Sequence, residues 1–205
     1  MKLFTRLIAM LLAVLMLTAC SAKTPASTAA STAEKPETTP VTTAAPETTA
    51  PDPWEALGSD GKVGTVLPDF TVTTAAGENF TLSEALKSHE LVFINLWATW
   101  CNPCSMEFPF LQDAYAEYGD RVAVIALSVE ENDTAKIMQE FAQKRQLSFP
   151  MAQDEGFRLT KAFYVTSIPT SLLVNQSREV LWMETGAKTS KAAFTQLFDQ
   201  YLNQP

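Results

Sequence analysis

Apolar residues along the chain predict alternating strands and helices between about residue 66 and residue 202. Two short runs, residues 91–96 and 121–128, are rich in β-branched side chains and nearly free of charge, which is typical of strands buried on both faces of a sheet. Between them, apolar residues recur at helical spacing, at Phe108, Leu111 and Tyr115. A strand, a crossover helix and a strand predict a parallel pair with a right-handed connection.

The segments around this unit predict further elements. Residues 66–73 and 79–82 indicate a hairpin that turns at Gly77, followed by a short helix that a capping box at residues 81–84 would open. After the second buried strand, a helix is predicted to begin at Asn132-Asp133, with three side chains turned inward: Ile137, Phe141 and Ala142.

The C-terminal part predicts the other half of a sheet. Short elements between residues 149 and 163 precede an antiparallel pair, residues 171–175 and 179–183. Thr189 or Ser190 is expected to cap a last helix, whose apolar positions are Phe194, Leu197, Phe198, Tyr201 and Leu202. The order, βαβ and then ββα after an N-terminal hairpin, predicts an α/β fold with a central mixed sheet flanked by helices.

Two cysteines follow the first buried strand directly. Cys101 is expected at the N-terminus of the next helix and Cys104 one turn inside it, where free N–H groups and the helix dipole stabilise a thiolate. The spacing lets the two sulfurs form a disulfide and release it again, and the intervening Asn102-Pro103 suits a first helical turn. This context predicts a redox-active dithiol.

Three other uses of these cysteines fit less well. A structural zinc site needs about four ligands, and beyond this pair the chain offers only Cys20 and His89. A permanent disulfide would gain little because its loop is so short. Inert buried thiols do not suit a helix start flanked by Trp97 and Trp100. We therefore expect no metal, and no cofactor besides the redox-active disulfide itself.

The segment Trp-Ala-Thr-Trp-Cys-Asn-Pro-Cys, residues 97–104, resembles the active site of the thioredoxin superfamily. Its continuation through Glu107-Phe108-Pro109 is closest to the membrane-tethered TlpA/ResA-like thiol–disulfide oxidoreductases. The resemblance covers residues 68–202 and implies a thioredoxin-like fold, with the hairpin as the N-terminal extension of this branch. It also implies that Ile168-Pro169 forms a cis-proline loop that packs on the cysteines.

The resemblance also suggests roles for the site residues. Cys101 is the expected nucleophile, which forms a mixed disulfide with a substrate, and Cys104 is the resolving thiol. Cys104 must lose a proton while largely buried, which desolvation opposes. Cytoplasmic thioredoxins carry a carboxylate six residues before the first cysteine, where this chain has Asn95. The resemblance assigns a functional role to Glu107 instead, although an acid early in a helix is also favoured by the dipole alone.

A docking surface for extended protein substrates is expected around the cysteines. Trp97 is expected either in the core or on this surface. The expected docking residues are Trp100, Asn102, Pro103, Ile168 and Pro169. The absence of histidine between the cysteines, and Ile168 before the proline, resemble reducing thioredoxins. The resemblance implies reduction of protein disulfides, for example the CxxCH of apocytochrome c, with electrons from a membrane thiol-transfer protein.

The N-terminal segment predicts export and anchoring. A basic start and the apolar run at residues 7–17, too short to span a membrane permanently, indicate a secretory signal. Leu-Thr-Ala-Cys at residues 17–20 resembles a bacterial lipobox, so Cys20 is expected to carry lipid; an ordinary secretory cleavage site is the alternative. The protein would then work outside the cytoplasm, anchored to the cell membrane, where disulfides persist.

Composition divides the chain into three parts. Residues 1–19 form the predicted signal peptide, residues 20–54 an anchor cysteine and a disordered Thr/Ala/Pro/Glu-rich linker, and residues 55–205 one folded domain. Without the signal peptide, 13 basic and 23 acidic residues remain. This acidic balance argues against nucleic-acid binding and against electrostatic adhesion to anionic lipid, so the lipid at Cys20 must hold the protein. We expect a monomer.

Two other functions compete with this interpretation. Residues 64–70 also resemble the start of peroxiredoxins, but Ile94 and Ala98 stand where a thiol peroxidase has a proline and a threonine or serine before its cysteine. A copper-handling lipoprotein of the Sco type, which is no catalyst, needs CxxxC and a later histidine, whereas His89 lies upstream of the pair.

Overall fold

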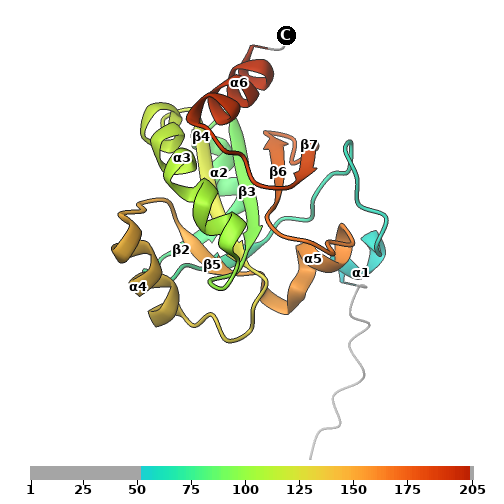
Figure 1. Cartoon of the computed structure of the whole chain (residues 1–205). Coiled ribbons are helices and arrows are strands. Elements are labelled where there is room, and N and C mark those ends of the chain that lie inside the picture. Colours follow the sequence, from blue (N-terminus) through green and yellow to red (C-terminus); the bar gives the residue numbers. More distant parts are fainter. Residues whose placement is uncertain (1–51, 204–205) are drawn as a thin grey trace, which may run out of the picture. The chain divides into compact units, whose positions relative to one another are not determined.

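A computed structural model of the chain describes residues 52–203, shown in colour in Figure 1. The predicted signal peptide, Cys20 and the linker up to residue 51 lie outside the described residues. Within residues 52–203, no helix is both long and apolar enough to span a bilayer.

A mixed five-stranded sheet forms the centre of the domain, in the order β5-β4-β3-β6-β7. Its central strand β3 pairs in parallel with β4 and antiparallel with β6. The strands are β3 (Leu91–Trp97), β4 (Val122–Ser128), β5 (Met151–Gln153), β6 (Thr170–Asn175) and β7 (Val180–Thr185). This arrangement confirms the predicted mixed sheet and its parallel crossover through α3 (Asn102–Tyr118).

The predicted hairpin forms a separate two-stranded sheet of β1 (Thr71–Thr73) and β2 (Asn79–Thr81). Its turn contains Gly77 at φ +87°, a left-handed conformation that glycine adopts without strain. The residues between the two strands extend the pairing to the main sheet, because Thr74 bridges Ala152 in β5.

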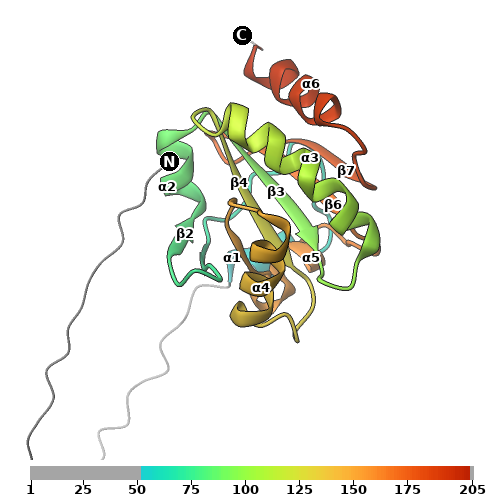
Figure 2. The same cartoon turned by 60° about the vertical axis from the view of Figure 1, so that its left-hand side comes forward.

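Helices cover both faces of the sheet, and Figure 2 shows α3 lying along β3 and β4. Side chains of β3 alternate, so Leu91, Phe93 and Trp97 pack with α3, α4 and α6, while Val92, Ile94 and Leu96 pack with α1, α2 and α5. Asn95 therefore lies on the α3 side. The helices are α1 (Pro53–Leu57), α2 (Leu82–Ser88), α4 (Ala135–Arg145), α5 (Arg158–Ala162) after the 3₁₀ turn Glu155–Phe157, and α6 (Lys191–Leu202).

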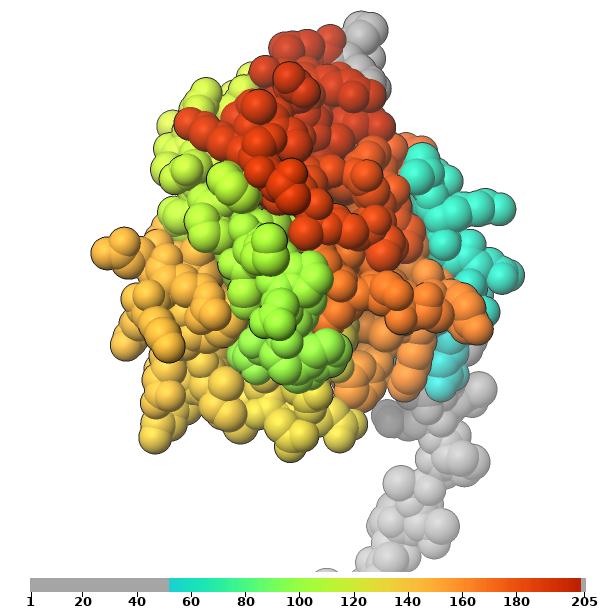
Figure 3. All heavy atoms as spheres, viewed as in Figure 1, coloured from blue at the N-terminus to red at the C-terminus, as the bar shows by residue number. Residues whose placement is uncertain are grey.

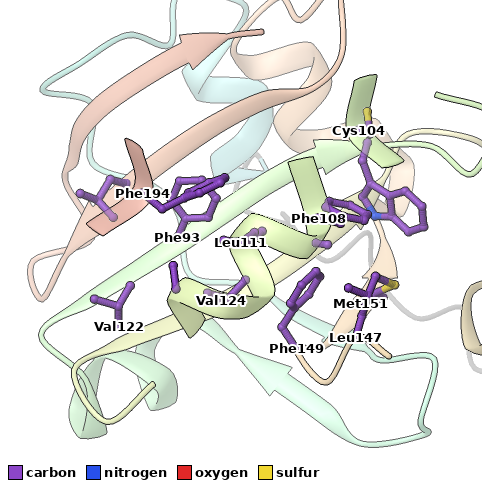
Figure 4. Packing of buried hydrophobic residues seen from close by; sticks show 14 of the residues in the cluster. Phe93, Cys104, Phe108, Leu111, Val122, Val124, Leu147, Phe149, Met151 and Phe194 are labelled. Carbon is purple, nitrogen blue, oxygen red and sulfur yellow. The ribbon is translucent and has the colours of Figure 1, made fainter. Parts of the chain in front are cut away.

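Aromatic rings dominate the core beneath α3 (Figure 4). Phe108 of α3 meets Phe149 edge-on with 5.4 Å between ring centroids, and Phe93 of β3 meets Phe194 of α6 at 5.8 Å. Such tilted contacts suit the ring quadrupoles and fix the helix on the sheet. The start of α3, and with it both cysteines, is thereby held at the end of β3.

The short helix begins after Thr81 as predicted, but its hydrogen bonding differs from the predicted capping box, and a later helix starts elsewhere than predicted. Thr81 makes no capping hydrogen bond with its side chain; instead the carboxylate of Asp69 accepts from Ser83 N–H at 2.9 Å and Ser83 Oγ at 2.6 Å. The later helix begins at Ala135, not at Asn132, with Thr134 as its cap. This helix buries Met138 and Phe141, whereas Ile137, predicted to point inward, is 42% exposed.

The folded domain begins earlier than predicted. Trp54, assigned to the linker, is only 9% exposed and packs on Phe70 with 6.0 Å between ring centroids. Asp52 caps the short helix that carries it, accepting from Trp54 N–H at 3.0 Å. A large aromatic ring with a core partner explains why the predicted boundary at residue 55 lies too late.

Candidate active site

Cys101 and Cys104 form a disulfide at the start of α3. Cys101 is the N-cap residue, and its Sγ accepts a hydrogen bond from Cys104 N–H at 3.2 Å. The helix start thus directs an N–H donor at the sulfur predicted to be the nucleophile, the arrangement that stabilises a thiolate. Cys104 is fully buried and Cys101 keeps 3% of its surface, so of the two cysteines only Cys101 retains any exposed surface.

The Ile168-Pro169 loop contacts this disulfide as expected. The Ile168–Pro169 bond is cis, and the Ile168 carbonyl oxygen lies 3.7 Å from Cys101 Sγ. The loop is held by Gly186 N–H, which donates to the Pro169 carbonyl at 2.8 Å, and by Thr170 Oγ1, which donates to Ser167 O at 2.7 Å. In Figure 3, the green start of α3 borders the orange segment before β6 and the yellow segment after β4.

The two tryptophans beside the cysteines have different roles. Trp97 is fully buried, with its ring centroid 4.8 Å from that of Phe141, and therefore belongs to the core. Trp100 is 63% exposed, and its Nε1–H donates to Glu130 Oε2 at 2.9 Å. Asn102 and Pro103 are exposed as well. The accessible surface beside Cys101 is thus formed by three of the residues expected there.

The segment after β4 holds the loop that leads to Cys101. Buried Asp133 accepts from Thr99 N–H at 2.8 Å and from Ser128 Oγ at 2.6 Å. Glu130 accepts from Asn132 N–H at 3.1 Å, and the hydrogen bonds from Asn132 and from the Trp100 indole hold the pKa of Glu130 below its usual range. Both carboxylates were missed from the sequence, because Asp133 was placed at a helix start and Glu130 was given no role.

Glu107 is a buried acid, since only 1% of it is exposed. Its Oε1 accepts from Asn95 Nδ2 at 2.7 Å and its Oε2 from Lys188 N–H at 2.9 Å. Burial raises the pKa of Glu107 to about 7, against the lowering effect of these hydrogen bonds and of the Lys188 charge, while Glu184 raises it. Near neutral pH this carboxyl can both take up and release a proton. Such burial does not fit a surface acid placed only by the helix dipole.

Two partners of Glu107 had gone unrecognised. Asn95 was noted only as the missing carboxylate, whereas it supplies a hydrogen bond to the acid one helix away. Lys188 lies 81 residues from Glu107 and carries no motif that marks it. Within residues 52–203, no cluster of three or more His, Cys, Asp or Glu side chains is placed to bind a metal ion.

The sequence of this chain is similar to known proteins. Residues 63–183 match the model of the AhpC/TSA family. The thiol-disulfide oxidoreductase ResA of Bacillus thuringiensis subsp. konkukian (strain 97-27) is 33% identical over 131 residues, which cover 63% of this chain and 73% of the relative.

Solved structures agree on the fold. StoA from Bacillus subtilis superposes with a TM-score of 0.56 at 23% identity, over 65% of this chain and 99% of that one. A putative thiol:disulfide interchange protein DsbE from Chlorobium tepidum superposes with a TM-score of 0.57 at 25% identity, over 69% of this chain and 96% of that one. Both agree with the thioredoxin-like fold predicted from the sequence. The chain therefore belongs to the AhpC/TSA family and is a thiol-disulfide oxidoreductase of the ResA type, with Cys101 and Cys104 as its active-site pair.

Proposed function

We propose that this oxidoreductase reduces disulfides of specific proteins outside the cytoplasm. The observation that carries the proposal is the Cys101–Cys104 disulfide at a helix start, beside an exposed tryptophan and with a buried glutamate one turn further on. A pair with one cysteine at the surface edge of the helix start and one fully buried cysteine suits two sequential exchanges.

The reaction begins with the reduced pair. The Cys101 thiolate attacks one sulfur of a substrate disulfide, so that a mixed disulfide forms and the first substrate thiolate leaves. Cys104 then gives up its proton, and its thiolate attacks Cys101 Sγ, which releases the second substrate thiolate. The substrate gains two electrons and two protons, and the enzyme is left with the Cys101–Cys104 disulfide.

Glu107 is the proposed acceptor of the Cys104 proton. It lies one turn beyond Cys104 on α3, and its pKa of about 7 lets an ionised fraction exist at neutral pH. A fully buried thiol loses its proton against desolvation, so a nearby carboxylate that can take the proton helps most in this second exchange. Asn95 cannot serve as a proton acceptor.

Five residues around Cys101 are proposed to bind the substrate chain. Trp100, Asn102 and Pro103 offer exposed surface on one side of the disulfide, and Ile168 and Pro169 line the other. An extended segment lying between them would present its disulfide to Cys101 Sγ. The resemblance to TlpA/ResA-like proteins suggests the CxxCH segment of apocytochrome c as one such substrate.

The cellular setting belongs to the same proposal. Residues 1–19 act as a lipoprotein signal, Cys20 carries the lipid that holds the protein to the membrane, and the following Thr/Ala/Pro/Glu-rich residues act as a spacer. A membrane thiol-transfer protein returns electrons to the disulfide, and the domain acts as a monomer. Replacement of Cys20 by Ser is expected to move the protein from the membrane fraction to the soluble extracytoplasmic fraction.

Trapping of the mixed disulfide tests the function directly. In cells that make Cys104→Ser, substrates should stay bonded to Cys101 and be released by dithiothreitol, which lets mass spectrometry identify them. A matched Cys101→Ser/Cys104→Ser double variant should capture none of these proteins. If both variants retain the same proteins, or neither retains any, reduction of protein disulfides is refuted.

Thiol peroxidase activity is the second candidate, and the match to the AhpC/TSA family favours testing it. Ile94 and Ala98 argue against it, because both positions lack the residues expected before a peroxidatic cysteine. Consumption of hydrogen peroxide by the reduced protein, faster than by its Cys101→Ser variant, would establish it. A Cu(I) titration of the same samples tests the copper-handling alternative.

A further inference from the structure

Asn95 and Ser171 form a polar pair inside the sheet. They lie directly opposite each other where β3 pairs antiparallel with β6, so both side chains point to the face that α3 covers. Asn95 has no exposed surface and Ser171 keeps only 5%. Buried polar side chains at the centre of a sheet destabilise the fold unless they are hydrogen-bonded, so this pair needs an explanation.

The Asn95 amide uses both of its hydrogens. Nδ2 donates to Glu107 Oε1 at 2.7 Å and to Ser171 Oγ at 2.9 Å, while Oδ1 is buried without a hydrogen-bond partner among the described residues. Two bonds from one nitrogen fix the plane of the amide and point the NH₂ group at the carboxyl. The fold accepts an unpaired carbonyl oxygen to keep this orientation, although such an atom is destabilising.

We propose that Ser171 is a positioning residue for the reaction: by accepting the second N–H of Asn95, it keeps the amide aligned as a donor to Glu107, so that this carboxyl stays an acceptor for the Cys104 proton. The inference rests on the proposed role of Glu107 in the second exchange. Ser171 acts through Asn95 and, within residues 52–203, makes no hydrogen bond to either cysteine sulfur.

The direction of the effect follows from electrostatics. A donor N–H favours the ionised carboxylate, so a well-aligned amide holds the pKa of Glu107 near 7 where burial alone would place it higher. Without the Ser171 hydroxyl, the Asn95 amide is held only by its hydrogen bond to Glu107. Because the amide can then turn, this bond weakens and the pKa of Glu107 rises. The charged groups that act on Glu107 are Lys188 and Glu184, and these are paired with each other at 2.5 Å, so they change little when Ser171 is replaced.

The test compares three substitutions in the full chain. Ser171→Ala removes the hydroxyl, Ser171→Thr restores one, and Thr74→Val removes an equally buried hydroxyl from the hairpin, since Thr74 is also 5% exposed. The titration of Glu107 is followed by NMR with ¹³C in the glutamate carboxyl carbons, and Glu107→Gln assigns the signal. The rate of the second exchange is measured across the same pH range.

Ser171→Ala is expected to move the carboxyl midpoint upward by about 0.5–1 pH unit, the size of one weakened hydrogen bond. Ser171→Thr should return it towards the original value, and Thr74→Val should leave it unchanged. An unmoved midpoint in Ser171→Ala overturns the inference. If Ser171→Ala does not fold, Ser171→Cys in the oxidised protein decides, because its thiol is of similar size but accepts the second N–H of Asn95 only weakly. It must move the midpoint in the same direction, and an unmoved midpoint overturns the inference.

The two proposals can fail separately. If Ser171→Ala moves the carboxyl titration but the rate profile stays in place, positioning of the carboxyl is supported and the role of Glu107 as proton acceptor is refuted. If Glu107→Gln slows the second exchange while Ser171→Ala moves neither titration nor rate, Glu107 keeps its role and the positioning by Ser171 is refuted.

Discussion

Asp133 binds Thr99 through both carboxylate oxygens: Oδ2 accepts from the backbone N–H at 2.8 Å and Oδ1 from the hydroxyl at 2.5 Å. The two residues are 34 positions apart, and Thr99 lies two residues before Cys101. This contact joins the segment after β4 to the loop that carries the accessible cysteine. The loop is thereby fixed before any substrate arrives, which is the kind of support a reactive group requires.

Removal of that carboxylate should destabilise the domain. Asp133→Ala leaves three donors without an acceptor, among them buried Ser128 Oγ, so the free energy of unfolding is expected to fall by about 2–4 kcal/mol. Urea unfolding of the oxidised protein measures the loss. Glu131→Ala, at an exposed neighbouring position, serves as the control and should change the stability little. Equal stabilities of the two variants would mean that the contact does not hold the loop.

Loss of the Glu107 carboxylate should slow the second exchange. In the unmodified protein the rate should rise as pH increases through about 7, because Glu107 becomes ionised there and can take the Cys104 proton. Glu107→Gln keeps the shape but cannot accept a proton, so we expect a loss of about 10²-fold near neutral pH. Stopped-flow kinetics of the mixed disulfide measures the step. An unchanged rate and pH profile would show that the buried acid takes no part.

The same carboxyl should make stability depend on pH. The pKa of Glu107 is raised from 4.5 to about 7 on folding, so between these values the folded protein holds a proton that the unfolded chain has lost. Stability is therefore highest below about pH 4.5 with respect to this group and falls as pH rises towards 7, by up to about 3 kcal/mol. Urea unfolding of the oxidised protein at pH 5 and pH 8 measures it. In Glu107→Gln that decline should be absent, whereas exposed Glu131→Gln should retain it.

Trp100 should matter for protein substrates and not for small ones. Trp100→Ala removes an exposed ring beside the disulfide, and we expect the KM for a protein disulfide to rise about 10-fold while the rate with a small aromatic disulfide stays the same. Met106→Ala is a matched control, since Met106 is 65% and Trp100 63% exposed. A similar rise in both variants, or in neither, would contradict a docking role for Trp100.

Local patterns were sufficient to predict most of the fold. The buried strand before Cys101, the helix after it and the last helix follow from hydrophobic spacing, and Ser190 caps that last helix by accepting from Ala193 N–H at 3.2 Å. These elements are determined by contiguous residues. The predicted capping hydrogen bond at Thr81 was wrong because Asp69 accepts from Ser83 instead. The helix start at Asn132 was wrong because Asp133 accepts from Thr99 and Thr134 caps the helix.

Two parts of the site could be predicted: the motif around the cysteines, and the Ile168-Pro169 loop that the family resemblance places on them. Both cysteines and Glu107 lie within one motif. In contrast, Ser171 reaches Asn95 only after the strands pair, and Lys188 reaches Glu107 only after the last loop folds over α3. A single sequence contains no signal for such register-dependent contacts. The raised pKa of Glu107 has the same origin, because burial by distant segments causes it.

The N-terminal extension has a further consequence for how molecules of this protein meet one another. Ala75 N–H donates to the Met151 carbonyl of β5 at 2.7 Å, and Gly64 N–H donates to the Val180 carbonyl of β7 at 2.8 Å, so part of each outermost strand already has a backbone partner. Unpaired strand edges are templates for aggregation. By pairing with these edges, residues 64–75 protect the domain against strand pairing between neighbouring molecules. Removal of the residues that precede residue 76 would leave both edges open to such pairing.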